Sequence, residues 1–451
     1  MNETQYRDDG FPRRLSAREH FTLRFPNGNV VMVARIEGPV SEARLKPAVA
    51  KLRRRHPLLG VRVARDQDQA TWFTPEGVPE IPVRVVPRTA PDAWVRAAIE
   101  AHREPFPCQT GPLIRFTLLT SGEVSDLIVV AHHAICDGLS LAYLIRDCLR
   151  HLSDPDREVE PLPVPPPVDP STIPVSISGN LVSRIGARLV NRSWRRKGIT
   201  FDERDYADLH RAFWGQHRGH MLAWALTEAQ TSALVARCRE ERVTVNTALV
   251  TAFVAAQKEH QGTHDHLKNV VVSVDYRDRL TQPVGEAFAF YASSVMPRLE
   301  VALGTPFWHT TRTFHAQIQG LLTDETVFAS QRLSAFHPSL LDGLVFAKYG
   351  KLDDRLANRL VEKMGINNVV AGLLITNLGR LDLPVDYGPL HLAAMYGPYV
   401  YSDTMEKYLG VMTVGGRMHF TLCSGETIID PPTVERVRDA AMDYLGEATG
   451  W

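Results

Sequence analysis

The sequence has no excess charge of either sign and no long apolar stretch. Its 451 residues include 51 Lys and Arg against 51 Asp and Glu, so no net field attracts nucleic acid or an anionic membrane as the main partner. The first 14 residues are polar and charged, unlike a signal peptide, and no apolar run approaches the length of a transmembrane helix. We therefore expect a soluble, cytoplasmic monomer that has no nucleic-acid partner and no integral membrane segment.

Cysteine is scarce as well. The five Cys residues are odd in number and lack paired spacing, which fits free thiols in a reducing compartment. No Cys and His cluster completes a tetrahedral metal shell, so the sequence predicts no metal site. Cys136 lies inside the most informative segment, but no neighbouring group would activate it as a nucleophile. We interpret it as a small packed residue.

The length and composition predict two domains of mixed α and β structure. A chain of 451 residues suggests two domains of about 200 residues each. Eight prolines crowd residues 154–174 and mark a stiff connector. We divide the chain into an N-terminal subdomain (1–153), a Pro-rich linker with a crossing helix (154–200) and a C-terminal subdomain (201–451).

The crossing helix is predicted over residues 180–197. Leu181, Ile185 and Leu189 share one face, and six basic residues lie elsewhere. This pattern favours a solvated helix packed across the domain junction. A helix lying on a membrane surface is the alternative.

The segment from Ala131 to Gly138 carries most of the chemical information. The apolar run before it predicts a buried strand, and leucines at helical spacing after it predict a helix. His132 and His133 thus lie at a strand end, on a turn that Gly138 permits. A neutral imidazole there is a candidate general base near pH 7, and Asp137 lies four residues after His133. Alternatively, the two histidines cap backbone groups or line a core.

The pattern His-His-x-x-x-Asp-Gly resembles the signature of the condensation-domain superfamily of CoA- and carrier-protein-dependent acyltransferases. Further landmarks of that superfamily follow in the expected order, among them Leu15-Ser16, Arg55-His56-Pro57, Val274-Asp275-Tyr276-Arg277 and Thr376-Asn377-Leu378-Gly379. The resemblance implies an α/β (α+β) fold of two chloramphenicol-acetyltransferase-like subdomains. Each would be a mixed sheet with packed helices, and the two would form a V-shaped pseudo-dimer with a channel between them.

The resemblance also implies roles for individual residues. His133 would be the general base, and His132 would point into the core as support. Asp137 would form a buried ion pair with Arg277 across the two halves and hold the histidine turn in register. The backbone N–H of Gly138 would help to stabilise an oxyanion.

The stretch around Asn377 and Gly379 has two interpretations. It lines the substrate channel or is a plain turn. It also lacks the Asn-Val-Pro-Gly sequence typical of wax ester synthases.

By resemblance, the protein transfers an acyl group from an acyl-CoA or acyl-carrier-protein thioester to a small alcohol or amine, giving an ester or an amide. The transfer would be direct and need no metal or redox cofactor, and the setting would be natural-product or lipid biosynthesis. We expect a free-standing protein without a carrier domain. The alternative function is a catalytically inactive condensation-like module that recruits a carrier protein or another biosynthetic partner. An epimerase-like activity using the same histidine is a further alternative.

Overall fold

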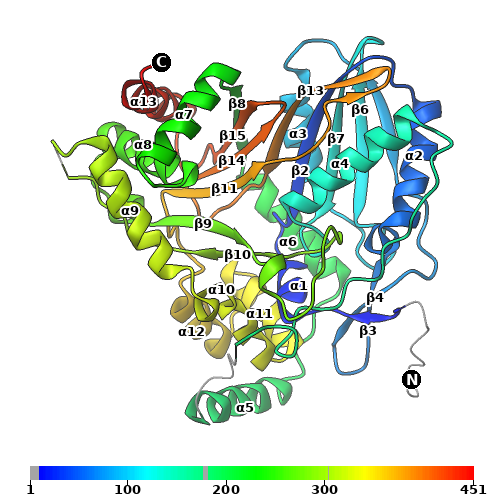
Figure 1. The fold of residues 1–451 in the computed structure, drawn as a ribbon. Coiled ribbons are helices and arrows are strands. Elements are labelled where there is room, and N and C mark those ends of the chain that lie inside the picture. The colour runs from blue at the N-terminus through cyan, green and yellow to red at the C-terminus, as the bar shows by residue number, and fades with distance from the viewer. Residues whose placement is uncertain (1–9, 176–180, 303) are drawn as a thin grey trace.

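The computed structural model describes residues 10–175, 181–302 and 304–451. Two six-stranded mixed sheets dominate it, one in each half of the picture (Figure 1). The first sheet has the order β12 (Asp386–Tyr387), β13 (Leu390–Tyr399), β2 (Asn29–Glu37), β7 (Val124–His132), β6 (Ile114–Thr120) and β5 (Val83–Pro87). The second has the order β10 (Ala292–Val295), β9 (Val270–Asp275), β11 (Leu373–Arg380), β14 (Lys407–Val414), β15 (Arg417–Gly425) and β8 (Gly219–Ala225).

Helices cover both faces of the first sheet and the outer face of the second. In the first half, α2 (Glu42–Arg55) and α4 (Gly138–Ser153) pack together on one face, and α3 (Ala93–Arg103) covers the other. In the second half, the outer layer consists of α7 (Glu228–Glu240), α8 (Val245–Gln261), α9 (Phe307–Leu321) and α13 (Pro431–Thr449). The predicted α/β fold of two halves, each a mixed sheet with packed helices, is confirmed.

The remaining elements are the strands of a third, three-stranded sheet and several further helices. They are β1 (Arg13–Arg14), α1 (Ala17–Thr22), β3 (Arg62–Arg65), β4 (Thr71–Thr74), α5 (Leu181–Arg195), α6 (Glu203–Gln216), α10 (Asp324–Val327), α11 (Pro338–Lys348) and α12 (Arg355–Met364). Short 3-10 turns include Pro57–Gly60 and Arg277–Arg279.

The predicted domain boundary is wrong for one segment. β13 belongs by sequence to the C-terminal subdomain (201–451), yet it pairs antiparallel with β2, and β12 continues that sheet beyond it. The orange β13 lies beside the blue β2 in Figure 1. β13 also packs over β14 and β15, so the two sheets meet along this strand. Gly410 of β14 and Gly397 of β13 approach so closely that a Cβ on Gly410 would lie 2.6 Å from the Gly397 carbonyl oxygen.

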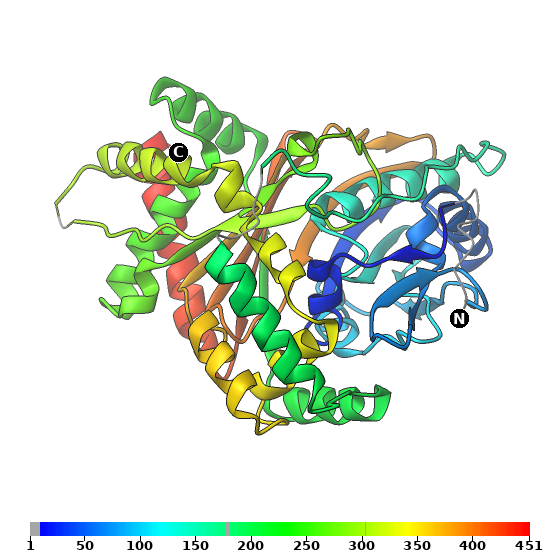
Figure 2. The ribbon, with the colours of Figure 1, turned by 90° about the horizontal axis from the view of Figure 1, so that it is seen from below.

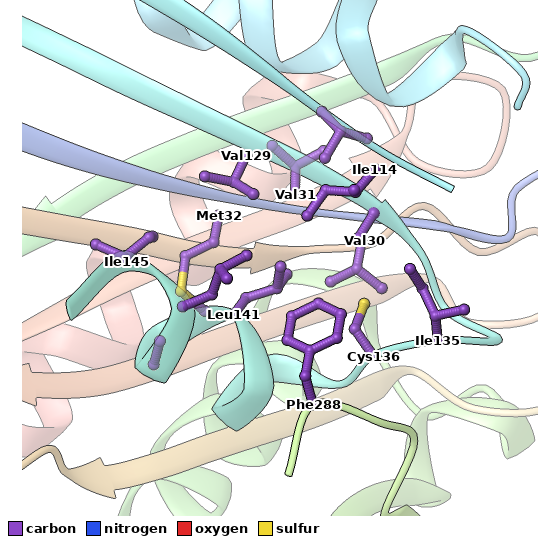
Figure 3. Close-up of a cluster of buried hydrophobic side chains, with 14 of the residues drawn as sticks. Val30, Val31, Met32, Ile114, Val129, Ile135, Cys136, Leu141, Ile145 and Phe288 are labelled. Carbon is purple, nitrogen blue, oxygen red and sulfur yellow. The ribbon is translucent and has the colours of Figure 1, made fainter. Parts of the chain in front are cut away.

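The core beneath the histidine turn explains why that turn is rigid. β7 is buried along nearly its whole length because β2 and β6 flank it and helices cover both faces, which accounts for its continuous apolar run. Figure 3 shows Cys136 among Val30, Ile135 and Phe288, in line with its interpretation as a packed residue. Burial raises the pKa of the Cys136 thiol, which leaves it in the unreactive protonated form. Phe288 belongs to the second half of the sequence, so this core joins the halves.

The crossing helix α5 differs from its prediction. Trp194 is buried and donates its indole N–H to the Ser339 hydroxyl at 2.9 Å, which fixes the helix end. Ile185 and Leu189 are, however, 47% and 61% exposed, so these two residues of the face expected to pack are open to solvent. The side chain of Leu181 lies outside the described part of the structure. Seen from below in Figure 2, α5 lies across the front of the molecule. None of the helices in the described parts of the chain is long and apolar enough to cross a bilayer.

Candidate active site

The histidine turn joins β7 to α4. His132 is the last residue of β7, and α4 begins at Gly138. Asp137 caps the helix, since its Oδ1 accepts a hydrogen bond from the Ser140 N–H at 2.9 Å. The His133 N–H donates to the Gly28 carbonyl at 2.8 Å, which fixes the turn against the chain entering β2. The strand end, turn and cap together leave His133 little freedom.

The two histidines face different surroundings. His132 is buried, and its Nδ1 accepts a hydrogen bond from the Ala134 N–H at 3.1 Å. Burial, with the nearby His133 and cationic side chains, lowers the pKa of His132 to about 3, so its ring is neutral at physiological pH. His133 instead lines a cavity between the two halves of the molecule.

His133 has the tautomer that a general base needs. Its Nδ1 lies 2.7 Å from the Cys136 carbonyl oxygen, which can only accept, so Nδ1 carries the proton and Nε2 keeps a free lone pair. Burial lowers the pKa of His133, although the Cys136 carbonyl and the nearby Asp137 raise it in part. The ring is therefore unprotonated at neutral pH. The Phe290 ring lies 4.2 Å from it, centre to centre, and limits its rotation.

Asp137 and Arg277 form the ion pair that the resemblance implied. Arg277 Nη2 lies 2.9 Å from Asp137 Oδ1, and both side chains are buried. The other carboxylate oxygen accepts the Tyr291 N–H at 2.9 Å, and Arg277 also donates to the Ser140 hydroxyl. Burial by itself would raise the pKa of Asp137, but Arg277 and these N–H donors bring it below its usual value. The pair joins the histidine turn to the end of β9.

The cavity beside His133 has a volume of about 250 Å³ and is mainly apolar. The first half of the chain contributes residues from α1, the turn before β2 and the histidine turn. The second half contributes residues from β9, β10, β11 and the segment after β13. The polar and charged lining residues are Arg18, Thr22, Asn27, His133, Asp137, Ser273, Ser293, Ser294, Thr376, Tyr401, Ser402 and Tyr408. The sequence patterns did not single out Arg18 of α1 as a lining residue.

Glycine occupies position 138 for a different reason from the one predicted. Its backbone φ is not positive, so the turn itself does not demand glycine. A Cβ at this position would lie 3.0 Å from a Leu378 methyl and 3.2 Å from the Pro398 ring. Space, rather than backbone freedom, therefore selects glycine at the first residue of α4.

Asn377 and Gly379 do not line the cavity that holds His133. They border a second cavity of about 500 Å³ between α7 and the ends of β11 and β14. Side chains alternate along a strand, so Thr376 and Leu378 face His133 and the N-terminus of α4, whereas Asn377 and Gly379 face away. The Asn377 side chain accepts the Gly379 N–H at 2.8 Å, which fits the plain-turn interpretation.

In the described ranges, no group of three or more His, Cys, Asp or Glu side chains could hold a metal ion. The site is therefore built from one histidine, a buried ion pair, a helix N-terminus and a partly apolar cavity.

Comparison with known proteins follows the same division of the chain. Residues 28–165 match the Condensation domain family. Residues 216–421 match the family described as the C-terminus of phthiocerol/phthiodiolone dimycocerosyl transferase. The chain belongs to the condensation-domain superfamily. Proteins of this superfamily to which it is similar include acyltransferases and peptide-synthetase condensation domains.

Among curated proteins, the chain is 31% identical over 175 residues to phosphinothricin tripeptide synthetase of Streptomyces viridochromogenes. The match covers 35% of this chain and 16% of that much longer protein. Among solved structures, trichothecene 15-O-acetyltransferase from Fusarium sporotrichioides has a TM-score of 0.66 at 12% identity, covering 96% of this chain and 94% of that one. The first condensation domain of the CDA synthetase has a TM-score of 0.65 at 17% identity, covering 98% and 97%. These structures support the condensation-domain fold.

Proposed function

We propose that this condensation-superfamily protein transfers an acyl group from a CoA or carrier-protein thioester to an alcohol or amine acceptor, with His133 as the general base. The observation that carries the proposal is the free Nε2 of His133, which faces the cavity between the halves while Nδ1–H is held by the Cys136 carbonyl. A neutral imidazole fixed in this way is ready to accept a proton.

The reaction would proceed by direct transfer. His133 Nε2 takes the proton from the acceptor O–H or N–H as that atom attacks the thioester carbonyl carbon. The tetrahedral intermediate then collapses, the C–S bond breaks, and the imidazolium returns its proton to the departing sulfur. No acyl-enzyme forms, and the chemistry requires no metal or redox cofactor.

The oxyanion would lie near the start of α4. The N–H groups of the first helical turn are not all used within the helix, and the positive end of the helix dipole favours negative charge there. Gly138 is the first residue of this 16-residue helix and lines the cavity. Its backbone N–H is thus a suitable donor for the oxyanion.

The second candidate function, an inactive module that recruits a carrier protein or another partner, is less well supported. A protein that only recruits has no need for a base with a free lone pair facing an open cavity. The intact ion pair between Asp137 and Arg277 further preserves the geometry of the histidine turn.

The test is acyl transfer by the purified protein. A panel of acyl-CoA thioesters is combined with primary alcohols and amines, and free thiol release and the ester or amide product are both measured. We expect product with at least one pair, and His133→Ala should abolish it. Absence of turnover with CoA and carrier-protein thioesters alike, combined with tight binding of an acyl-carrier protein, would favour the recruiting module.

A further inference from the structure

Arg18 places a positive charge beside His133. It lies in α1 and lines the same cavity as His133. Its guanidinium carbon lies 5.1 Å from the centre of the Phe290 ring, and that ring also packs against His133. Arg18 and His133 thus lie against the same aromatic ring.

The neighbouring carboxylates are engaged elsewhere. Glu19, the next residue, turns away and pairs with Arg13 at 2.7 Å. Asp137 pairs with Arg277 at 2.9 Å. Throughout the residues that the structure describes, no carboxylate lies within ion-pair distance of Arg18.

Among the described residues that line the cavity, Arg18 is the one cation, and it has no carboxylate partner. The other charged lining residue, Asp137, belongs to a separate cluster in which Arg277 lies 2.9 Å from both Asp137 and Asp275. His133 is neutral because burial lowers its pKa. Burial lowers the pKa of Arg18, although the residue remains of intermediate exposure. Its guanidinium thus faces the cavity with N–H donors that no described carboxylate accepts, and these donors are available to a negatively charged ligand.

We propose that Arg18 binds a carboxylate group of the substrate held beside His133. This inference rests on the proposed acyl transfer and deepens it by naming a chemical class of substrate. A guanidinium presents a planar fork of N–H donors that matches a carboxylate with two parallel hydrogen bonds. A carboxylate brings one negative charge to the one guanidinium among the described lining residues. The mainly apolar walls suit the short carbon chain that joins the carboxylate to the reacting group.

The carboxylate has two sources, because the cavity serves both substrates of the transfer. It belongs either to a dicarboxylic acyl donor or to a hydroxy- or amino-acid acceptor. Two matched pairs of probes separate these sources. Succinyl-CoA is compared with its neutral amide, succinamoyl-CoA, and 4-hydroxybutanoate is compared with 4-hydroxybutanamide.

Binding of each probe is measured by calorimetry without a co-substrate, so that no turnover is needed. In the wild-type protein, the carboxylate member of one pair should bind at least about tenfold more tightly than its amide. Arg18→Met should remove this preference, and Arg18→Lys should restore part of it. Arg54→Met is the matched control, because Arg54 is exposed on α2, away from the cavity, and its loss should leave the preference intact. Melting temperatures establish that each variant is folded.

Equal binding of the members of both pairs by the wild-type protein, or binding of none of the four probes, would overturn the inference. A carboxylate preference that survives in Arg18→Met would do the same. The proposed function fails in a different way. If the protein prefers the carboxylate through Arg18 but transfers no acyl group to any acceptor, the carboxylate site stands and the proposed function is contradicted. If the protein transfers acyl groups equally well with and without the carboxylate, the proposed function stands and the carboxylate site is contradicted.

Discussion

Two buried carboxylates join the halves of the molecule, and they do so in different ways. Asp137 meets one arginine from across the junction, Arg277, and otherwise accepts backbone N–H groups. Asp342 of α11 meets three basic side chains from the first half: Arg65 at 2.8 Å, His20 at 3.2 Å and Arg24 at 3.7 Å. Both carboxylates are almost inaccessible to solvent.

The two carboxylates differ in whether they border the cavity that holds His133. The Asp342 cluster has cationic partners in excess and borders no part of the cavity that holds His133. Asp137 has a single cationic partner from the opposite half, but it caps α4 four residues after His133. The first cluster should therefore affect stability alone, and the second should affect stability and catalysis together.

The largest expected effect lies at His133. His133→Ala should reduce acyl transfer by about 10²–10⁴-fold, because a positioned general base contributes a factor of this size. The free energy of unfolding should change little, since the ring faces a cavity. Turnover is measured with a competent donor and acceptor, and circular dichroism follows unfolding. A variant that retains most of its activity would exclude His133 as the base.

Substitutions in the ion pair of Asp137 and Arg277 should reduce both stability and activity. Arg277→Ala strands the buried carboxylate of Asp137 and should cost about 3–5 kcal/mol of stability as well as activity. Asp137→Ala should cost less stability, because Arg277 keeps its ion pair with Asp275 at 2.9 Å. The double substitution should cost less than the sum of the single ones, because the interaction between Asp137 and Arg277 is lost only once. Denaturant unfolding of the four proteins gives the coupling free energy. Additive effects, or wild-type stability of Arg277→Ala, would contradict the pairing.

Substitution of Asp342 should reduce stability without reducing activity. Asp342→Ala should cost a similar amount, about 3–5 kcal/mol, while the folded fraction keeps its turnover number. Burial by itself would raise the pKa of Asp342, but the surrounding His20, Arg24 and Arg65 bring it well below its usual value. The stabilisation is therefore present above about pH 4 and is lost as the pH falls towards the folded-state pKa. The difference in the free energy of unfolding between the wild type and Asp342→Ala should therefore decrease at acidic pH. A turnover number reduced as much as in Asp137→Ala would remove the distinction between the clusters.

A smaller effect is expected at His132. This ring stays neutral in the folded protein down to a pKa of about 3, whereas in the unfolded chain it takes up a proton near pH 6.5. The unfolded state binds more protons between these values, so the wild-type protein loses stability as the pH falls. For this one group the loss between pH 7 and pH 5 is about 2 kcal/mol. His132→Ala should have a lower melting temperature than the wild type at pH 7 and a partial rate defect. Its stability should fall less than that of the wild type between pH 7 and pH 5. An equal loss in both proteins would contradict the buried neutral ring.

The smallest expected effect is on the pH profile of activity. Because burial lowers the pKa of His133, the acidic limb of kcat/KM should lie below pH 6.5. The charge of Arg18 contributes to this lowering, so Arg18→Met should move the limb towards higher pH. An acidic limb above pH 6.5 in the wild-type protein would contradict the burial of the base.

Local patterns predicted the parts of the molecule in which the signal is short-range. The apolar run before His132 and the leucines after Gly138 predicted the strand, turn and helix that position His133. The pairing of Asp137 with Arg277 came from a family motif, because no local pattern links residues 140 positions apart.

Other parts depend on relations that local patterns do not contain. The local sequence of the strand over Leu390–Tyr399 does not indicate which of the two sheets this strand joins. Asn377 and Gly379 lie on the correct strand end, but alternation turns them to the opposite face. Asp342 stands within an apolar run, Leu340 to Leu344, and this was a readable sign of a buried, paired carboxylate. Its three partners could be found only in three dimensions.

The passage of β13 into the first sheet has a consequence for the order in which the protein can be made. β2 emerges from the ribosome early, but one of its two neighbouring strands is among the last to be synthesised. Until then the growing chain presents an open strand edge, which can pair with any other exposed strand. The first half cannot complete its fold before most of the second half has been translated. A gene split at the Pro-rich connector would therefore yield two fragments that need each other, rather than two separate domains.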